Sequence, residues 1–351
     1  MSDILNYSQP LVSVIMANYN TPIEYLKEAI ESVLNQTYSN LELIIVDDCS
    51  TNDSVRYIES INDKRIVLKK NDTNKGPAYT RNRAFDIAHG KYIAIMDSDD
   101  ISDIFRLQKQ VDYMENNPNT IVCASWANVF GDGVKTPWMF NPSFPKNEIF
   151  KISLLFGNTF IVNSTVMMDR DTIEKHNVRF IEEYTASQDY KMWVDCVRYG
   201  EFAMITEPLV RRRVRQKSIT TSSGGLQEYY RWRIIEEQLN KLHYILSEEK
   251  KKYYNCIYSP RKLYDLRTKD IIKELISANK LYRVYKQQSF KKYLWKKWAV
   301  ISIYGLKNRK GVKKRIQVLL KMPISRYHYM IKTVVTLLSE KRHDNRIREK
   351  H

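Results

Sequence analysis

Apolar and polar residues form alternating blocks along the first 130 residues, and these blocks predict strands and helices in turn. Val12 to Ala17 is a short apolar run of the kind that forms a buried strand. Ile23 to Gln36 instead repeats its apolar residues at helical spacing. Further strands are predicted at Leu41–Val46, Ile66–Leu68 and Lys91–Met96, and helices near Ser54–Ile61, Ala78–Ala88 and Ile104–Asn116. Strands separated by single helices require crossover connections, which predict a mostly parallel sheet between helices, a nucleotide-binding architecture.

The stretch Lys91 to Asp100 joins a strand to a dense group of acids. Its apolar run is typical of a strand buried on both faces of a parallel sheet, and it ends in Asp97, Asp99 and Asp100. Ligands bind outside the carboxyl ends of such strands, where crowded carboxylates repel one another unless a cation neutralises them. Because hard oxygen ligands suit Mg²⁺ or Mn²⁺, the pattern predicts a metal-bound diphosphate at this strand end.

The same acids have a simpler interpretation as the N-cap of a helix. Asp100 to Asp103 precede the amphipathic segment Ile104 to Asn116, and acidic residues stabilise a first helical turn. Capping accounts for one aspartate but not for three, so we favour the metal interpretation.

Length and composition limit the class of protein. The chain has 351 residues, enough for one large α/β domain with an extension or for two domains. Its four cysteines are far apart and form no C-x-x-C pair, which favours reduced thiols in a cytosolic setting. The first apolar run is short and no basic residue precedes Lys27, so we expect no signal peptide or membrane span.

The net charge of +17 lies entirely in the last fifth of the chain. Leu281 to His351 contains 20 Lys and Arg against three acidic residues, and Trp295, Trp298 and Tyr304 are interleaved with them. Helices are predicted at Leu226–Leu246, Thr268–Tyr285, Phe290–Tyr304, Val312–Lys321 and Ile324–Leu338. Basic helices with bordering aromatics suit an anionic membrane surface. A solvated helical cap whose apolar stripes pack on the rest of the protein fits the same pattern.

Five segments occur in an order and spacing that resemble family 2 glycosyltransferases. They are VSVIMANYN (Val12–Asn20), IIVDDCSTNDS (Ile44–Ser54), NKGPAYTRNRA (Asn74–Ala84), KYIAIMDSDD (Lys91–Asp100) and SQDYKMW (Ser187–Trp193). The resemblance covers Leu11 to Thr221 and implies an inverting enzyme of the GT-A fold that uses a nucleotide-diphosphate sugar. We therefore expect an α/β fold of GT-A type with a catalytic domain at residues 1–225. A basic helical C-terminal region would follow at residues 226–351.

The resemblance assigns the nucleoside pocket to the ends of the first two strands. Ala17 and Tyr19 would line the base pocket, Asp48 would accept the imide N–H of uracil, and Arg81 would lie near the base. A carboxylate is an acceptor only, which suits a ring that presents one N–H donor. Simpler roles exist: Asp47 and Asp48 fit a turn before a helix, and Arg81 fits a solvated helix charge.

The resemblance assigns Asp97 to the ribose and the metal and Asp99 to direct metal coordination. The ion, Mn²⁺ or Mg²⁺, would neutralise the diphosphate so that it can leave. Arg215 stands where the family commonly has His, and a guanidinium cannot ligate a metal. It either leaves the metal without a third protein ligand or holds a phosphate bidentately. The polar run Ser218 to Gly225 is a candidate lid over the donor.

The acceptor side is assigned to the middle of the chain. Asp189 would be the general base that takes the proton of the acceptor hydroxyl. Gln188 stands where the family usually has Glu, and Asn163 replaces a His before Ser-Thr. The alternative for Asp189 is that it caps a helix from Tyr190 to Tyr199.

Together these features predict an enzyme that moves a hexose from a UDP-sugar to a saccharide or polyprenyl-diphosphate-linked acceptor. Bacterial-type surface polysaccharide synthesis, on the cytoplasmic face of a membrane, is the expected setting. A nucleotidyltransferase is the first alternative, but no basic, Gly-rich triphosphate loop lies near Tyr19. The second is a nucleic-acid-binding protein with a basic tail; because the tail matches no nucleic-acid motif, we expect no nucleic-acid partner.

Overall fold

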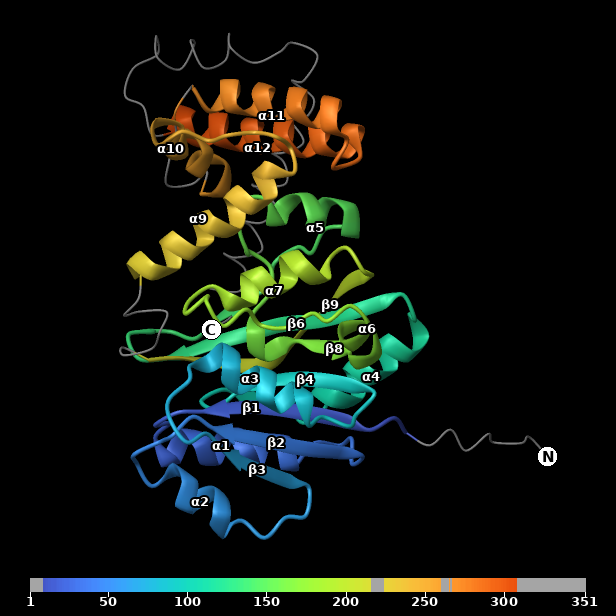
Figure 1. Cartoon of the computed structure of the whole chain (residues 1–351), viewed down its shortest axis with the longest axis vertical. Helices are drawn as coiled ribbons and strands as arrows, with labels where there is room; N and C mark the ends of the chain where they lie inside the picture. Colours follow the sequence, from blue (N-terminus) through green and yellow to red (C-terminus); the bar gives the residue numbers. More distant parts are fainter. Residues whose placement is uncertain (1–8, 216–223, 260–264, 266, 308–351) are drawn as a thin grey trace, which may run out of the picture. The chain divides into compact units, whose positions relative to one another are not determined.

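The structure is a computed structural model that describes residues 9–215, 224–259, 265 and 267–307 (Figure 1). The chain divides into two compact units. One contains residues 1–147 and 158–232, and the other contains residues 148–157 and 233–351. The predicted helices at 312–321 and 324–338, and the candidate lid up to residue 223, lie outside the described residues.

A sheet runs through the first unit, with nine strands among the residues described. Its order is β3-β2-β1-β4-β8-β6-β9-β5, and β7 pairs with β6. The strands β3, β2, β1 and β4 are parallel, as are β6 and β9, whereas β8 is antiparallel to both of its neighbours. The bounds are β1 Val12–Asn18, β2 Leu41–Asp47, β3 Ile66–Lys70, β4 Tyr92–Asp97, β5 Ile101–Ser102, β6 Thr120–Gly131, β7 Trp138–Phe140, β8 Met167–Asp169 and β9 Glu201–Val214. The predicted α/β fold with a parallel nucleotide-binding half is confirmed.

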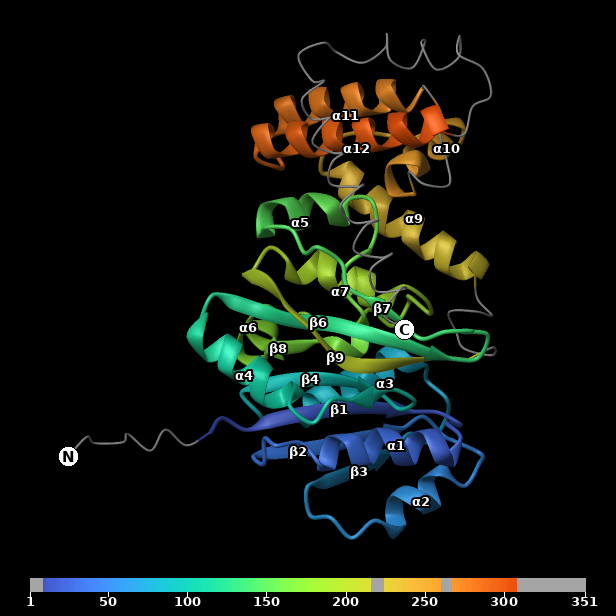
Figure 2. The same ribbon diagram turned by 180° about the vertical axis from the view of Figure 1, so that it is seen from behind.

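Helices cover both faces of the parallel strands (Figures 1 and 2). On one face, apolar residues of α1 and α4 such as Ile30 and Val111 share a core with Val14 and Met96 of the sheet. On the opposite face lies α3, which buries Phe85. The helices are α1 Ile23–Leu34, α2 Ser54–Ser60, α3 Pro77–Asp86, α4 Arg106–Asn116, α6 Arg170–Lys175 and α7 Gln188–Cys196, with a 3₁₀ turn at Asn163–Thr165.

The strand β4 is buried on both faces, as its apolar run predicts. Every residue from Tyr92 to Met96 is at most 3% exposed. Fully burying one such large side chain stabilises the fold by roughly 1.5–3 kcal/mol. This run therefore fixes the position of Asp97, the last residue of the strand.

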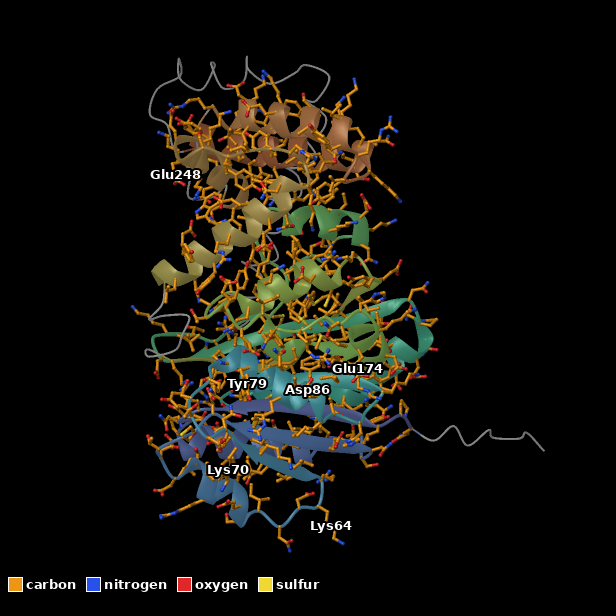
Figure 3. All side chains as sticks on the ribbon, viewed as in Figure 1. Lys64, Lys70, Tyr79, Asp86, Glu174 and Glu248 are labelled. Atoms are coloured by element: carbon orange, nitrogen blue, oxygen red, sulfur yellow. The ribbon has the colours of Figure 1, made fainter. Side chains whose placement is uncertain are left out.

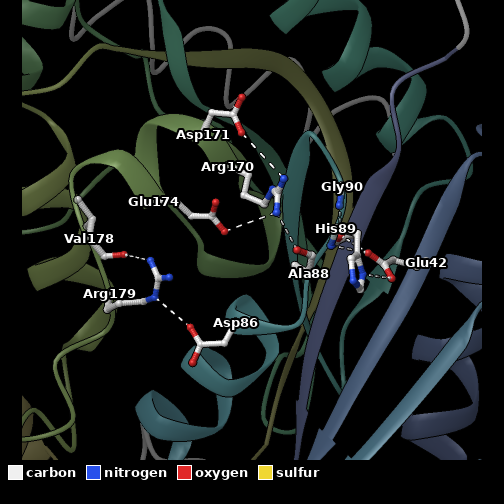
Figure 4. A network of polar contacts seen from close by, with 11 residues as sticks. Glu42, Asp86, Ala88, His89, Gly90, Arg170, Asp171, Glu174, Val178 and Arg179 are labelled. Carbon is white, nitrogen blue, oxygen red and sulfur yellow. Dashed lines mark hydrogen bonds and ion pairs between the residues drawn. The ribbon is translucent and has the colours of Figure 1, made fainter.

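At the amino ends of β1, β2 and β4 a polar network closes the sheet (Figure 4). Glu42 accepts hydrogen bonds from Ser13 Oγ at 2.6 Å and from the His89 backbone N–H at 2.8 Å. Ser13 Oγ in turn accepts the backbone N–H of Gly90 at 2.8 Å. A Cβ on Gly90 would lie 2.5 Å from the backbone nitrogen of Ser13, so only glycine fits this approach.

Two arginines extend this network to α6 and α3. Arg170 donates to the carbonyl oxygen of Ala88 at 3.0 Å and lies 3.5 Å from Glu174. Arg179 lies 3.4 Å from Asp86. Asp86 and Glu174 are also labelled in Figure 3, which shows the side chains of the described residues. These contacts join the segment after β8 to the connection between α3 and β4.

The second unit is helical in the residues described. The helix α9 carries the chain from the first unit into the second. The bounds are α5 Asn147–Leu154, α9 Gly224–Asn240, α10 Glu248–Tyr258, α11 Thr268–Tyr282 and α12 Gln287–Lys307. The helix α10 was not predicted, because its first half is charged and its buried residues all lie in its second half.

The aromatic residues of α12 serve mainly as core. Trp298 is 1% exposed and Phe290 is fully buried, stacked on Tyr285 with ring centres 5.1 Å apart. The expectation that Trp298 lies at a membrane surface is therefore wrong. The face of α12 that carries Trp298 packs inside the helical unit. Burial there removes more apolar surface from water than a position at the surface would. Within the part of the chain described, no helix combines the length and apolar character that a bilayer crossing requires.

Candidate active site

The carboxyl ends of β1 and β2 meet in a buried polar cluster around Asp47. Asn18 Nδ2 donates to Asp47 Oδ1 at 2.6 Å, and the backbone N–H of Ser50 donates to Oδ2 at 2.9 Å. Asp47 is only 2% exposed. It therefore orders the turn after β2, and the turn role suggested for it is confirmed.

Asp48 fixes the loop that leads into α3. Its Oδ1 accepts from Asn71 Nδ2 and from the backbone N–H of Lys75, each at 2.8 Å, and its Oδ2 accepts the N–H of Gly76 at 2.8 Å. A carboxylate offers about four lone-pair positions. These three bonds leave about one acceptor position on Asp48 unused.

The residues assigned to the base pocket follow the same strand ends. Ala17 pairs with Asp97 of β4 in the sheet register, and Tyr19 is 49% exposed. Asn20 and Cys49 have left-handed backbone angles, with φ of 49° and 63°. Such angles cost on the order of 1–3 kcal/mol in residues other than glycine and cluster at functional sites.

Asp97 is held by three side chains. It accepts from Arg81 Nη2 at 2.9 Å, Ser164 Oγ at 2.9 Å and Asn163 Nδ2 at 3.3 Å. Burial alone would raise the pKa of Asp97, but the Arg81 guanidinium and the two other donors hold it below its usual value. The Arg81 side chain is only 15% exposed, so its interpretation as a solvated helix charge is wrong.

Asp99 and Asp100 contact the end of β9. Asp99 Oδ2 lies 2.6 Å from Arg215 Nε, and Asp100 Oδ1 accepts the backbone N–H of Arg213 at 2.7 Å. Ser164 Oγ is also within hydrogen-bond distance of Asp100 Oδ2, so Asp97 and Asp100 share its single hydroxyl hydrogen. Burial raises the pKa of Asp99 despite the adjacent guanidinium, and burial with the two neighbouring aspartates raises that of Asp100 well above its usual value. The neighbouring carboxylates therefore repel one another, as the sequence predicts.

The helix-cap interpretation of Asp100 is wrong. The two residues after it form β5, and α4 begins only at Arg106. Asp103 is the acid that acts near the helix start, because its Oδ1 accepts the N–H of Phe105 at 3.0 Å. Asp100 instead binds β9 and the 3₁₀ turn.

Arg213 anchors the end of β9. Its Nε donates to the carbonyl oxygen of Asp99 at 2.9 Å, and its Nη2 pairs with Glu28. The guanidinium carbon lies 4.1 Å from the ring centre of Tyr25 and 4.5 Å from that of Phe130. This side chain is therefore a fixed part of the site wall.

Asp189 lies in the first turn of α7. Its Oδ2 accepts from Asn158 Nδ2 at 3.3 Å, and burial raises its pKa. The N-cap position belongs to Ser187, which has a left-handed φ of 58°, so the capping alternative for Asp189 is wrong. A carboxylate with a raised pKa is a stronger base than an exposed one.

Arg81 links the acids of β4 to the start of α7. Its Nη2 contacts Asp97 at 2.9 Å while its Nη1 donates to Gln188 Oε1 at 3.4 Å. Gln188 is 8% exposed and immediately precedes Asp189. One guanidinium thus brings together residues that are 91 positions apart in the numbering, Asp97 and Gln188.

Ser164 and Arg106 are site residues that the sequence analysis missed. Arg106 is 1% exposed and donates to the carbonyl oxygens of Ile95 at 2.9 Å and Val166 at 3.1 Å. Burial lowers its pKa to about 10, while the acids nearby favour its charged form. On an amphipathic helix an arginine resembles a surface charge, and a serine carries no pattern, so only the fold could have identified them.

The donor set suits a divalent ion that is shared with a substrate. Asp97 and Asp99 supply carboxylate oxygens, and Asn163 Oδ1 is a buried oxygen without a hydrogen-bond partner. Among the residues described, no three His, Cys, Asp or Glu side chains form a metal-binding group. Mg²⁺ is commonly held by one or two carboxylates together with substrate phosphates, so these residues fit such an ion.

The parallel strands β3, β2, β1 and β4, covered by helices on both faces, and the acidic edge after β4 form a fold of the GT-A type. The crystal structure of S. aureus TarS 1-349 in complex with UDP-GlcNAc is similar, with a TM-score of 0.57 and 19% identity over 88% of each chain. At this identity the likeness shows the fold alone.

Sequence relatives give the family. Residues 13–176 match Glycosyl transferase family 2. An uncharacterized glycosyltransferase of Methanocaldococcus jannaschii is 35% identical over 71% of this chain and 84% of its own length. WfaP of Escherichia coli, a UDP-Glc:alpha-D-GlcNAc-diphosphoundecaprenol beta-1,3-glucosyltransferase, is 33% identical over 63% of this chain and 83% of its own. The chain belongs to glycosyltransferase family 2.

Proposed function

We propose that this chain transfers a hexose from a UDP-sugar to a saccharide or polyprenyl-diphosphate-linked acceptor, with inversion at the anomeric carbon. Two relatives from Escherichia coli, WfaP and WfgD, are named for UDP-Glc as donor and GlcNAc-diphosphoundecaprenol as acceptor. TarS, which shares the fold, has been crystallised with UDP and with UDP-GlcNAc. Bacterial-type surface polysaccharide synthesis is the process that this chemistry suits.

The observation that carries the proposal is the bridge through Arg81. A donor site needs acids at the strand end, and an acceptor site needs a base within reach of the same sugar carbon. The contacts of Arg81 with Asp97 and with Gln188, next to Asp189, support a common site for both. No second class of function has an equivalent observation in its favour.

The donor would lie along the carboxyl ends of β1, β2 and β4. Ala17 and Tyr19 would border the base, Asp48 would use its remaining acceptor position for the uracil imide, and Arg81 would lie close by. Asp97 and Asp99 would hold Mn²⁺ or Mg²⁺, since the family is generally dependent on a divalent metal. Such an ion supplies positive charge that stabilises the departing diphosphate.

Asp189 would act as the general base. Its ionised carboxylate accepts the proton of the acceptor hydroxyl while that oxygen bonds to the anomeric carbon and the bond to the diphosphate breaks. Attack from the face opposite the leaving group inverts the configuration. The raised pKa of Asp189 brings its basicity nearer to the working pH, and Asn158 orients it.

The basic C-terminal region would hold the enzyme on the cytoplasmic face of a membrane, where a lipid-linked acceptor is presented. The support is the charge of residues 281–351, where all of the net +17 lies. Each Lys or Arg near an anionic surface adds about 1 kcal/mol of attraction. The division of the chain into a catalytic domain, residues 1–225, and a basic helical C-terminal region, residues 226–351, is part of the proposal.

The test is turnover of a panel of UDP-sugars in the presence of Mn²⁺ and GlcNAc-diphosphoundecaprenol. We expect one donor to give a glycosylated lipid and all competent donors to release UDP slowly without acceptor. Proton NMR of the product should show the anomeric configuration opposite to that of the donor. A retained configuration, or no UDP released from any sugar, would contradict the proposal.

A further inference from the structure

Arg215 forms an ion pair with Asp99, one of the two acids proposed to bind the metal. Its Nε is 2.6 Å from Asp99 Oδ2, with side-chain exposures of 29% for Arg215 and 15% for Asp99. The contact offsets part of the repulsion among the three acids at the end of β4. A divalent ion on the same carboxylate would place two cations beside one another. The arginine and the ion therefore compete for Asp99.

The two arginines at the acidic edge differ in side-chain exposure, and the more exposed one, Arg215, is the one to which we assign a change of partner. Both side chains reach Asp99, Arg213 at its backbone carbonyl oxygen and Arg215 at its carboxylate. Arg213 is 10% exposed and is held by Glu28, the Asp99 carbonyl and two aromatic rings. Arg215 is about three times as exposed and comes just after the last residue of β9.

We propose that Arg215 exchanges Asp99 for the donor diphosphate when donor and metal bind. A guanidinium presents paired N–H groups that match two phosphate oxygens, and it remains charged at every working pH. Binding of the diphosphate would remove Arg215 from Asp99 and open that carboxylate to the ion. This inference rests on the proposed function, because it assumes a nucleotide-diphosphate donor at this edge.

The exchange predicts reciprocal coupling between nucleotide and metal. UDP strengthens Mn²⁺ binding because it takes Arg215 away from Asp99, and Mn²⁺ strengthens UDP binding by the same factor. Couplings of this kind typically amount to about 5–150-fold. Without UDP, Arg215 keeps Mn²⁺ binding weak.

Calorimetric titrations of Mn²⁺ and of UDP into the full chain test this inference. In Arg215→Met, Mn²⁺ alone should bind more tightly than in the parent, whereas UDP with saturating Mn²⁺ should bind about tenfold or more weakly. Arg215→Lys keeps the charge without the paired donors and should fall between the two. The control is Arg170→Met, an ion-paired arginine of similar side-chain exposure, 26%, in the network at the amino end of β4, the opposite end of the strand from Asp99; it should behave as the parent.

The outcomes separate the two proposals. Parent-like UDP affinity in Arg215→Met, or a UDP-free Mn²⁺ affinity in that variant that is no higher than in the parent, would overturn the exchange and leave the proposed function standing. A parent chain that binds no UDP would overturn the proposed function and this inference together. A midpoint of thermal unfolding equal to that of the parent shows that a variant is folded. If Arg215→Met does not fold, the Mn²⁺ and UDP affinities of Arg215→Lys provide the test.

Discussion

The two ends of the same parallel strands use their charged groups in opposite ways. At the amino end, Glu42 Oε1 accepts from Ser13 Oγ and from the His89 N–H, so the carboxylate is held within the network. At the carboxyl end, Asp97 and Asp99 are crowded, buried, and offset by arginines. The amino end adds stability and the carboxyl end retains binding capacity. The difference lies in the donors: Glu42 accepts from a hydroxyl and a backbone N–H, whereas Asp97 and Asp99 face guanidinium groups, which bind phosphate as well as carboxylate.

The largest expected effect is at Asp189. Asp189→Asn keeps the shape but cannot take a proton, so transfer should fall by about 10²–10⁴-fold while UDP affinity remains within about twofold. Steady-state transfer rates and UDP titration measure the two quantities. Equal losses of transfer and UDP affinity would show that Asp189 binds rather than catalyses.

The pH dependence of the transfer rate provides a control for Asp189→Asn. Burial raises the pKa of Asp189, so its base form is lost as pH falls through a value above the usual aspartate range. The transfer rate of the parent should fall tenfold per pH unit below that point. The residual activity of Asp189→Asn should lack this acidic limb.

A smaller effect is expected at the amino end, and on stability. Glu42→Ala leaves the buried Ser13 hydroxyl and the His89 N–H without their acceptor, which should lower the free energy of unfolding by about 1–3 kcal/mol. Glu42→Gln retains an acceptor and should lose less. Urea unfolding measures both variants. At a temperature where both variants are folded, their transfer activity should match that of the parent. A loss of activity without a loss of stability would show that the amino end of the strands contributes to the active site.

The smallest effect is expected from the exposed lysines of α12. A chain cut near residue 279 would lose this helix, whose Phe290 and Trp298 are core, so substitution is the better test. Changing Lys291, Lys292 and Lys296 to Gln removes up to about 3 kcal/mol of attraction to an anionic surface. Sedimentation with anionic vesicles at low salt should recover less of this variant than of the parent. Equal recovery would show that these lysines do not contact lipid.

Local patterns predicted much of the fold. The apolar run of β4 and the helical spacing of α1 depend on period and burial, which a single sequence displays. The end of β4 at Asp97 could be predicted from the same apolar run, because such a run stops where the chain leaves the core.

What could not be predicted depends on pairings between distant segments. The bonds of Ser164 to Asp97 and Asp100, and of Arg213 to Asp99, join residues more than 60 positions apart. Arg106 resembles a surface charge until the 3₁₀ turn and β4 enclose it. Trp298 shows the reverse error, since an aromatic beside lysines fits a membrane surface and a helical core equally well until its packing is known.

The most direct test of the claim that the carboxyl end is the donor site is UDP binding by Asp99→Ala with and without Mn²⁺. The account predicts that Mn²⁺ strengthens UDP binding in the parent and in Glu42→Ala but not in Asp99→Ala. It also predicts that Asp99→Ala unfolds within about 1 kcal/mol of the parent, because a crowded acid adds little stability. An Asp99→Ala chain whose UDP affinity still rises with Mn²⁺ as in the parent would contradict it.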